Sequence, residues 1–240
     1  MKKVLVVGAS GATGMPLVQQ LLDNKVNVIA IVRQASALPK AMTAQSELQV
    51  VEGSITEMLD DELMLHLKAC DAVISCLGHN LTFKGMYGHP RRLVTNTVVK
   101  ISQIIESIKP ERKIKYILMN TSGNCNHDIP EKPPLSQSVM VSIVRLLLPP
   151  HVDNEQAADF LRQTIGQQHP FIEWVAVRPD SLINDDKVTD YNIYPSPIRN
   201  VIFDAGKTSR INVAHFMGRL VVDEQLWQTW KGKMPVIYNQ

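Results

Sequence analysis

Cysteine is scarce in this sequence. The 240 residues include three cysteines, Cys70, Cys76 and Cys125, whose wide spacing gives neither a disulfide framework nor a CxxC metal-binding pattern. Cys70 and Cys76 flank an expected strand, where a thiol acts as a small core-filling group. A chain of this length buries a sizeable core without disulfides or metals.

Metal-ligand patterns are missing as well. His127-Asp128 has no partner at a ligand spacing. No HxH or HxxxH pair is formed by His66, His79, His89, His169 or His215. We therefore expect no metal site.

Long hydrophobic runs are absent. The longest apolar stretch, Val139 to Pro150, is interrupted by Ser142 and Arg145 and falls short of the roughly 18 residues that span a bilayer. The start, Met1-Lys2-Lys3, resembles the charged region of a signal peptide, but glycines follow the short apolar run Val4–Val7. We therefore expect a cytoplasmic protein with no membrane partner.

Charge of one sign is not in excess. Lys and Arg total 25 and Asp and Glu total 23, which leaves a net charge of +2. The basic groups Arg91-Arg92 and Arg112–Lys115 are short and separate, whereas a nucleic-acid binder usually carries a clustered basic stripe. The composition therefore argues against a nucleic-acid partner.

Apolar runs of strand length alternate with amphipathic runs of helix length. This alternation is typical of a parallel sheet with helices on both faces, so we predict one α/β domain over residues 1–240, a Rossmann-type doubly wound sheet with strand order 3-2-1-4-5-6. The expected strands are Lys3–Val7, Val26–Val32, Leu48–Glu52, Ala72–Leu77, Lys115–Asn120 and Glu173–Arg178, with a possible seventh at Val236–Tyr238. The expected helices are Gly14–Asn24, Glu57–Ala69, Pro90–Ile108, Asn154–Gly166 and Val213–Asp223.

One helix carries its own start and stop signals. Asp153 followed by Gln156 resembles a capping box, in which Asp153 accepts a hydrogen bond from the first turn. Gly166 lies near the far end as a stop. These signals predict a helix over Asn154–Gly166 and favour a capping role for Asp153 over that of a base.

Two segments, residues 124–152 and 184–208, escape the alternation. Both follow strands on the carboxyl side of the sheet, where ligands bind, and we expect them to build the substrate side. Within the first, Ser138–Leu148 is apolar nearly all round when wound as a helix and needs a cover: the substrate cleft, a second subunit or a membrane surface. Arg145 is its single cation, which makes the membrane the weakest choice. We expect a lid over an apolar pocket, the alternative being a core helix without substrate contact.

The strongest pattern is a buried strand, a glycine-rich loop and an amphipathic helix near residue 1. Gly8 permits a tight turn, Gly11 lets the backbone approach a pyrophosphate, and Gly14 lets the helix pack against the strand. The helix N-terminus offers N–H groups and a positive dipole end to the phosphates. The predicted cofactor-binding residues of this loop are Gly8, Ser10, Gly11, Ala12, Thr13 and Gly14.

The end of the second strand decides between two dinucleotides. An NAD site places Asp or Glu there to bind the ribose 2′-hydroxyl. Here the strand ends in Arg33, and no carboxylate lies between Lys25 and Glu47. A guanidinium pairs with a 2′-phosphate and stacks on adenine. We therefore predict NADP(H) rather than NAD(H), the alternative for Arg33 being a surface charge.

The glycine spacing, Arg33, the run Val175–Pro179 and the late segment Ser209–Ala214 resemble the short-chain dehydrogenase/reductase superfamily. More narrowly, the chain is similar to its atypical branch, which includes NmrA-like and biliverdin-reductase-B or flavin-reductase-like NAD(P)H-binding proteins. The resemblance covers almost the whole chain.

The resemblance implies further cofactor contacts at strand ends. Ser54 and Ile55 take the place of the family's Asp-x pair near adenine, with Ser54 replacing the usual Asp. Residues after the fourth strand lie along the ribose, and residues after the fifth and sixth strands flank the nicotinamide. These are Cys76, Leu77 and Gly78, then Asn120 and Thr121, then Pro179 and Leu182. From the residues alone, each is equally compatible with an ordinary strand-end turn.

The usual acid of the superfamily is missing. Its standard members carry a YxxxK pair on the helix before strand six, where this sequence has Pro150 and Asn154, and no YxxxK occurs in the chain. Ser122 occupies the place of the superfamily's catalytic Ser and is a candidate for bonding a substrate oxygen. His151 is a candidate proton donor near neutral pH, the alternative being a solvated loop histidine.

The sequence therefore favours an NADP(H)-dependent oxidoreductase. Its acceptor is expected to be a small, apolar or conjugated molecule such as a flavin, quinone or tetrapyrrole, which takes a proton from water. A non-catalytic NADPH-binding regulator is the main alternative. A sugar-nucleotide epimerase or dehydratase fits less well, because it needs YxxxK and a larger C-terminal substrate domain. The expected partner is a small molecule, and the chain a monomer or homodimer.

Overall fold

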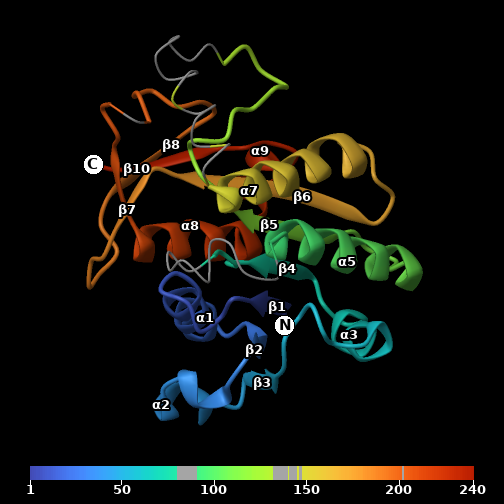
Figure 1. The fold of residues 1–240 in the computed structure, drawn as a ribbon. Helices are drawn as coiled ribbons and strands as arrows, with labels where there is room; N and C mark the ends of the chain where they lie inside the picture. The colour runs from blue at the N-terminus through green and yellow to red at the C-terminus, as the bar shows by residue number, and fades with distance from the viewer. Residues whose placement is uncertain (80–90, 132–139, 141–144, 146–147, 202) are drawn as a thin grey trace.

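Eight strands form one sheet through the centre of the molecule (Figure 1). The computed structural model describes residues 1–79, 91–131, 140, 145, 148–201 and 203–240. The strand order is β3-β2-β1-β4-β5-β6-β10-β8, which confirms the predicted order and the seventh strand. All neighbouring strands of this sheet run parallel except β10 and β8, which run antiparallel. The predicted strands are observed as β1 Lys3–Val7, β2 Asn27–Val32, β3 Leu48–Glu52, β4 Ala72–Ser75, β5 Ile114–Met119, β6 Ile172–Pro179 and β10 Val236–Asn239.

Three short strands were not predicted. β8 (Tyr191–Tyr194) pairs antiparallel with β10 at the edge of the sheet. β7 (Ser181–Ile183) and β9 (Lys207–Ser209) form a separate parallel pair. The expectation that residues 184–208 are irregular throughout is therefore wrong. These strands have three or four residues each and contain polar residues, so they carry no clear apolar pattern.

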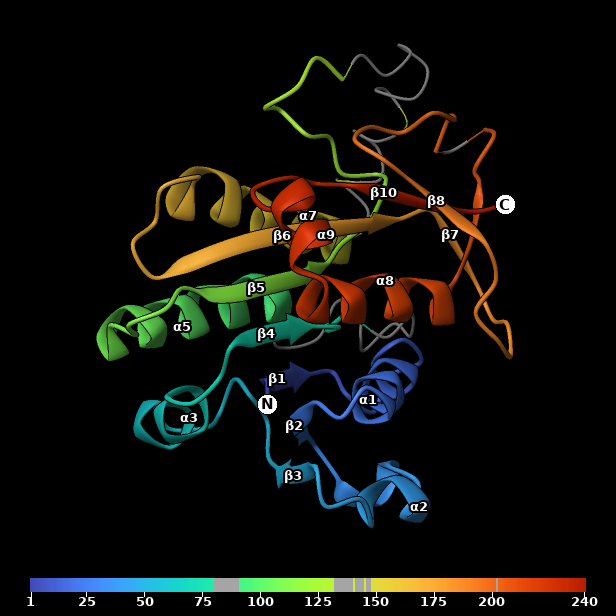
Figure 2. The ribbon, with the colours of Figure 1, turned by 180° about the vertical axis from the view of Figure 1, so that it is seen from behind.

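Helices cover both faces of the sheet, as Figures 1 and 2 show from opposite sides. Helices α1, α2, α8 and α9 pack on one face, and α3, α5, α7 and η2 pack on the other. None of the helices within the described ranges is long and apolar enough to cross a membrane. Their bounds are α1 Gly14–Asp23, η1 Ala35–Ala37, α2 Lys40–Thr43, α3 Asp60–Leu67, α5 Leu93–Ile108, α7 Pro149–Asp159, the π-helix η2 Phe160–Ile165, α8 Arg210–Val222 and α9 Glu224–Trp230.

The apolar strands are buried on both sides. In β1, Val4 and Val6 pack into the layer that contains α1 and α8. Leu5 and Val7 point the other way, into the layer that contains α3 and α5. Because successive side chains of a strand alternate between faces, a strand covered on both sides must be apolar at every position. This requirement explains the unbroken apolar runs in the sequence.

Helix α7 begins at Pro149 and not at Asn154, so the predicted capping box is wrong. Asp153 lies inside α7, and its carboxylate accepts hydrogen bonds from the main-chain N–H groups of Val94 and Thr95, at 2.8 and 2.9 Å. It therefore caps α5, a helix distant in sequence, and not its own. Proline suits the first turn of a helix because it has no N–H to leave unpaired.

Two predicted helices fall partly beyond the described residues. Helix α5 begins at Leu93, and the predicted start at Pro90 lies outside the described part of the chain. Of the predicted lid helix Ser138–Leu148, the structure describes Met140, Arg145 and Leu148. The lid hypothesis therefore stays a prediction.

A fully buried arginine joins the sheet to the segments around it. All five N–H donors of Arg178, in β6, have acceptors. Its Nε donates to the carbonyl of Met234 at 2.7 Å. Its two terminal nitrogens donate to the Glu131 carboxylate at 2.6 and 3.0 Å and to the carbonyls of Asn124 and Pro195. The arginine therefore holds part of both segments that follow the sheet's carboxyl edge.

We expect Glu131→Gln to lower the free energy of unfolding by about 3–5 kcal/mol, because it leaves a buried guanidinium without its counter-charge. Urea denaturation measures the change. Asp204→Asn is the matched control: it breaks the Arg199–Asp204 pair, whose side chains are 48% and 62% exposed, and we expect little effect. Equal effects of the two variants would contradict a special role for the buried pair.

The same pair predicts a pH dependence. Burial by itself raises the pKa of Glu131, but hydrogen bonding and charge from Arg178 outweigh it and hold the pKa below its ordinary value of 4.5. Because the folded pKa lies below the unfolded one, the stabilisation is complete above the unfolded value and is lost as pH falls through the folded pKa. The stability gap between the wild type and Glu131→Gln should therefore shrink on acidification from about pH 7 to about pH 3. A constant gap would contradict the assignment.

Candidate functional site

The loop between β1 and α1 is a turn that needs glycine at two positions. Gly8 has a φ of +76°, and a Cβ there would lie 2.7 Å from the carbonyl group of Cys76 at the end of β4. A Cβ on Gly14 would lie 2.1 Å from the Gly8 carbonyl oxygen. Gly11 is different, because a Cβ there meets only the Gly8 oxygen at 3.2 Å. The fold alone therefore accounts for Gly8 and Gly14 but not for Gly11.

The start of α1 is left open to a ligand. Thr13, at the N-cap position, makes no side-chain capping hydrogen bond, and the first turn contains no acidic residue. A helix N-terminus carries a partial positive charge and favours an anion. Gly11 and Ala12 are exposed beside it. The turn and the helix start together provide a place where a phosphate group fits.

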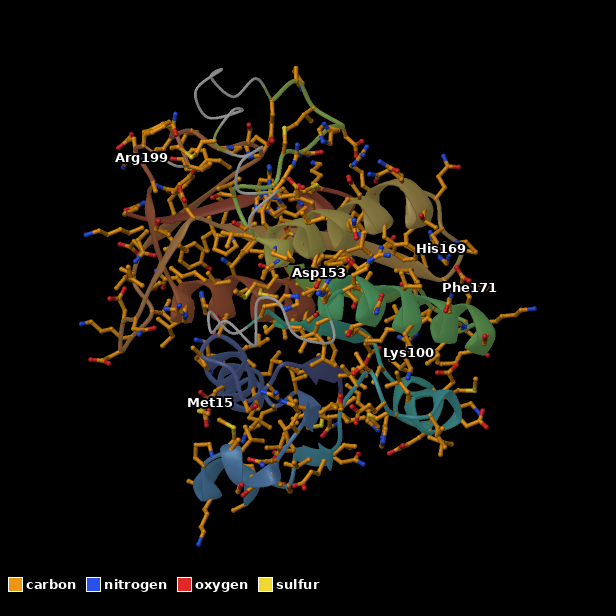
Figure 3. The ribbon with its side chains drawn as sticks, viewed as in Figure 1. Met15, Lys100, Asp153, His169, Phe171 and Arg199 are labelled. Carbon is orange, nitrogen blue, oxygen red and sulfur yellow. The ribbon has the colours of Figure 1, made fainter. Side chains whose placement is uncertain are left out.

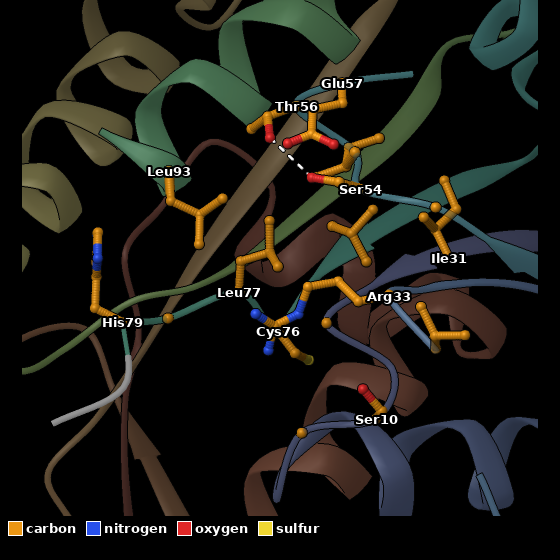
Figure 4. A pocket seen from close by; sticks show the side chains of 17 residues that line it. Ser10, Ile31, Arg33, Ser54, Thr56, Glu57, Cys76, Leu77, His79 and Leu93 are labelled. Atoms are coloured by element: carbon orange, nitrogen blue, oxygen red, sulfur yellow. Dashed lines mark hydrogen bonds between the residues drawn. The ribbon is translucent and has the colours of Figure 1, made fainter. Parts of the chain in front are cut away.

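A pocket of about 720 Å³ lies along the carboxyl ends of β1, β2, β3 and β4 (Figure 4). This volume is in the range of small-molecule and cofactor sites. In Figure 4, Ser54, Thr56 and Glu57 lie on one side, Ser10 on the other and Arg33 between them. The sequence-predicted residues that line the pocket are Gly8, Ser10, Gly11, Arg33, Ser54, Ile55, Cys76, Leu77 and Gly78.

Arg33 is an exposed cation in this pocket. Among the described residues, none makes a hydrogen bond or ion pair with its guanidinium. On the wall formed after β3, the hydroxyl groups of Ser54 and Thr56 lie 3.0 Å apart. The pocket therefore joins one unpaired positive charge to a polar wall and to the open start of α1.

The remaining predicted cofactor residues do not line this pocket. Thr13 and Gly14 are buried in the turn, and Ala12 is exposed. Asn120 is buried after β5, where its amide donates to the Asn154 carbonyl at 2.8 Å and its side-chain oxygen accepts from the N–H of Thr121. Pro179 ends β6, and Leu182 lies in β7. These residues lie at or shortly after the carboxyl ends of β5 and β6; they are Asn120, Thr121, Pro179 and Leu182.

Ser122 is buried and already engaged. Its hydroxyl donates to Asp180 at 3.1 Å, and the same carboxylate accepts from the N–H groups of Ser181 and Gly206. Burial raises the pKa of Asp180 despite these hydrogen bonds. The arrangement fixes the chain after β5 to the chain after β6. The catalytic role of Ser122 stays a prediction.

His151 lies in the first turn of α7, so its expected place in a loop is wrong. Its Nε2 lies 3.2 Å from Glu155, and Arg145 donates to the same carboxylate at 2.8 Å. Burial acts to raise the pKa of Glu155, but the nearby His151 and the hydrogen-bonded Arg145 outweigh it and lower the pKa. The imidazole also packs against Gly123. His151 does not line the pocket, and its catalytic role stays a prediction.

Sequence reasoning missed His79, which lines the pocket beside Leu93. Its Nε2 lies 2.7 Å from the Asp153 carboxylate, and both side chains are almost fully buried. The available signal was its position, directly after the predicted contact Gly78. Nothing in the sequence indicated its partner, which follows 74 residues later.

No cluster of three or more His, Cys, Asp or Glu residues suited to a metal ion occurs in the described ranges.

The site combines a glycine turn, an open helix start and a cation at the end of the second strand. A parallel α/β sheet with these features defines the class of dinucleotide-binding proteins.

Comparison with known proteins gives the family. A family of NAD(P)H-binding proteins matches residues 8–224, and the chain belongs to this family. No curated protein matches the sequence.

Solved structures share the fold at low sequence identity. One is a wide-type short-chain dehydrogenase/reductase from Veillonella parvula in complex with NADP, with 15% identity, 99% of this chain and 94% of that chain covered and a TM-score of 0.70. Another is the oxidoreductase ylbE from Lactococcus lactis, with 17% identity, coverage of 99% and 91% and a TM-score of 0.69. A third is the anaerobillin reductase ChuY from Escherichia coli, with 16% identity, coverage of 99% and 97% and a TM-score of 0.67.

The turn yields a prediction about two glycines. Gly14→Ala places a methyl group against the Gly8 carbonyl, so we expect it to lower the free energy of unfolding by about 1–3 kcal/mol or more. Gly11→Ala meets the same oxygen at 3.2 Å, a contact that a small shift relieves, so it should change stability less, by about 1 kcal/mol or less. Thermal and urea unfolding measure both. A stable Gly14→Ala protein would show that the turn relaxes freely.

Proposed function

We propose that the protein is an NADP(H)-dependent oxidoreductase that passes a hydride to a small, apolar or conjugated acceptor. The observation that carries this proposal is the unpaired Arg33 guanidinium in a pocket bounded by the glycine turn. An exposed cation at the end of the second strand suits the 2′-phosphate that distinguishes NADP from NAD.

The chain offers a contact for each part of the cofactor. Residues 8–14 and the start of α1 would hold the pyrophosphate, and Arg33 the 2′-phosphate. Ser54 and Ile55 would flank adenine, and residues 76–78 would follow the ribose. Asn120, Thr121, Pro179 and Leu182 would surround the nicotinamide, which supplies the hydride when bound.

The acceptor class is inferred from what stands where the superfamily's acid pair would be. Pro150 and Asn154 lie in α7, and the Asn154 amide donates to the Pro150 carbonyl at 3.1 Å. Neither side chain is an acid. A conjugated acceptor, which spreads the added charge over many atoms, tolerates this loss better than a simple ketone. The similar fold of ChuY, an anaerobillin reductase, supports a role as a reductase.

A non-catalytic NADPH sensor is the second candidate. The missing acid pair favours it, because a protein that only binds the cofactor needs no proton donor. The two candidates share the cofactor site and differ in turnover, so one assay separates them.

Arg33→Ala tests the cofactor preference. We expect it to weaken NADPH binding by roughly 1–3 kcal/mol, the scale of a lost charge-assisted contact, and to leave NADH affinity almost unchanged. Isothermal titration calorimetry with each cofactor measures this. Arg112→Ala removes a cation that is 91% exposed and lies outside the pocket, and serves as the control. Equal wild-type affinities for NADPH and NADH would refute the preference.

Turnover tests the reaction class. The wild type is incubated with NADPH and a panel of flavins, quinones, linear tetrapyrroles and small carbonyls, and the absorbance of the reduced nicotinamide is followed. We expect oxidation with at least one conjugated acceptor and slower oxidation with simple carbonyls. Tight NADPH binding without turnover on any acceptor would favour the sensor instead.

A further inference from the structure

A buried histidine and aspartate meet at one end of the pocket. His79 Nε2 lies 2.7 Å from Asp153 Oδ2, and the two side chains are 4% and 1% exposed. In Figure 4, His79 and Leu93 lie at the opposite end of the pocket from Ile31. Burying two ionisable side chains lowers stability unless each is hydrogen-bonded. A buried His–Asp pair beside a pocket is therefore a candidate for a functional role.

Asp153 is held in place independently of the histidine. Its carboxylate accepts from the N–H groups of Val94 and Thr95, and its main-chain carbonyl accepts from the Thr95 hydroxyl at 2.9 Å. Figure 3 shows Asp153 where α7 meets α5. A carboxylate fixed by two main-chain donors provides a rigid support for the imidazole, because it restricts both the orientation of the ring and the nitrogen that faces Asp153.

The pair lies on the side of the pocket that leads to the expected acceptor position. β4 neighbours β5 in the sheet, and the residues proposed to surround the nicotinamide follow β5 and β6. His79 follows the end of β4 and lines the pocket, whereas His151 does not. Asp153 precedes Asn154, which stands in one of the two positions of the missing YxxxK pair. His79 therefore lines the described pocket at its β4 end, toward the expected acceptor side, with Asp153 behind it.

We propose that His79, positioned by Asp153, donates the proton that reduction of the acceptor requires. This inference rests on the proposed oxidoreductase function. The acceptor gains a hydride from the reduced cofactor, and the Nδ1–H bond of the His79 imidazolium breaks, Nε2 being the nitrogen that faces Asp153. The proton goes to the acceptor atom that carries the new electron pair, and the neutral imidazole then takes a proton from water.

The groups that face His79 come from two helices. The Asp153 carboxylate of α7 lies 2.7 Å from its Nε2. Helix α5 contributes the neutral main-chain donors of Val94 and Thr95, which bond to Asp153. Burial raises the pKa of the Cys76 thiol, at the end of β4, to about 12, so this neighbour in the pocket stays neutral near pH 7.

The test compares His79→Gln with the wild type on whichever acceptor turns over. We expect kcat/KM to fall by about 10²-fold or more, while NADPH affinity measured by calorimetry stays within about twofold. In the wild type, kcat should decrease at high pH as the imidazolium loses its proton, and this decrease should vanish in the variant. The imidazole signal of His79 in nuclear magnetic resonance spectra should titrate over the same pH range.

Two further variants separate proton donation from a structural role. Asp153→Asn keeps the imidazole but removes its counter-charge, so the decrease in kcat should move to lower pH. Thr95→Val removes the hydroxyl bond to the Asp153 carbonyl while leaving the carboxylate, and should shift stability but not the pH profile. His66→Gln, in α3 and outside the pocket, is the matched histidine control.

The outcomes are distinguishable. If the wild type reduces an acceptor and His79→Gln retains both the rate and the pH profile, this inference is overturned and the proposed function stands. If the wild type binds NADPH but reduces no acceptor, the proposed oxidoreductase function fails at the wild type, and the inference fails with it. Loss of NADPH binding in a folded His79→Gln protein would also overturn it, because the residue would then be part of the cofactor site only.

Discussion

The segments that follow the carboxyl ends of β5 and β6 depend on the burial of one guanidinium. A charge as far from water as that of Arg178 is tolerated only if every donor finds an acceptor. Its acceptors come from the chain after β5, from the region after β8 and from the approach to β10. These segments must therefore adopt compatible conformations together. The glycine turn is independent of this network and imposes its own constraint, a close approach of β1, β4 and α1.

Local signals in the sequence predicted the elements whose causes are local. Apolar runs predicted the central parallel strands, because a strand buried on both faces needs them, and β1 is observed with the predicted bounds. The short, half-buried strand β8 has no such run and pairs with β10, which follows far along the chain. Asp153 shows the same limit: its sequence neighbours predicted a cap for its own helix, whereas its partners belong to α5.

The candidate site divides in a similar way. The predicted phosphate-binding roles of the glycine loop and of Arg33 rest on short sequence motifs. The structure brings these residues together in one pocket with Ser54 and residues 76–78. The His79–Asp153 contact joins residues 74 positions apart, and no periodicity or motif in the sequence predicts this contact. The glycine turn and Arg33 can thus be inferred from the sequence, whereas the His79–Asp153 contact is visible only in the folded structure.

The two halves of the site are also separated in the order in which the chain is made. Within the described part of the chain, the residues that line the pocket lie between Val7 and Leu93. The Arg178 network needs the carbonyl of Met234, close to the last residue. On a ribosome, the residues of the pocket emerge well before those that complete the opposite side. A growing chain therefore contains all the lining residues of its nucleotide pocket long before the enclosure around Arg178 can close.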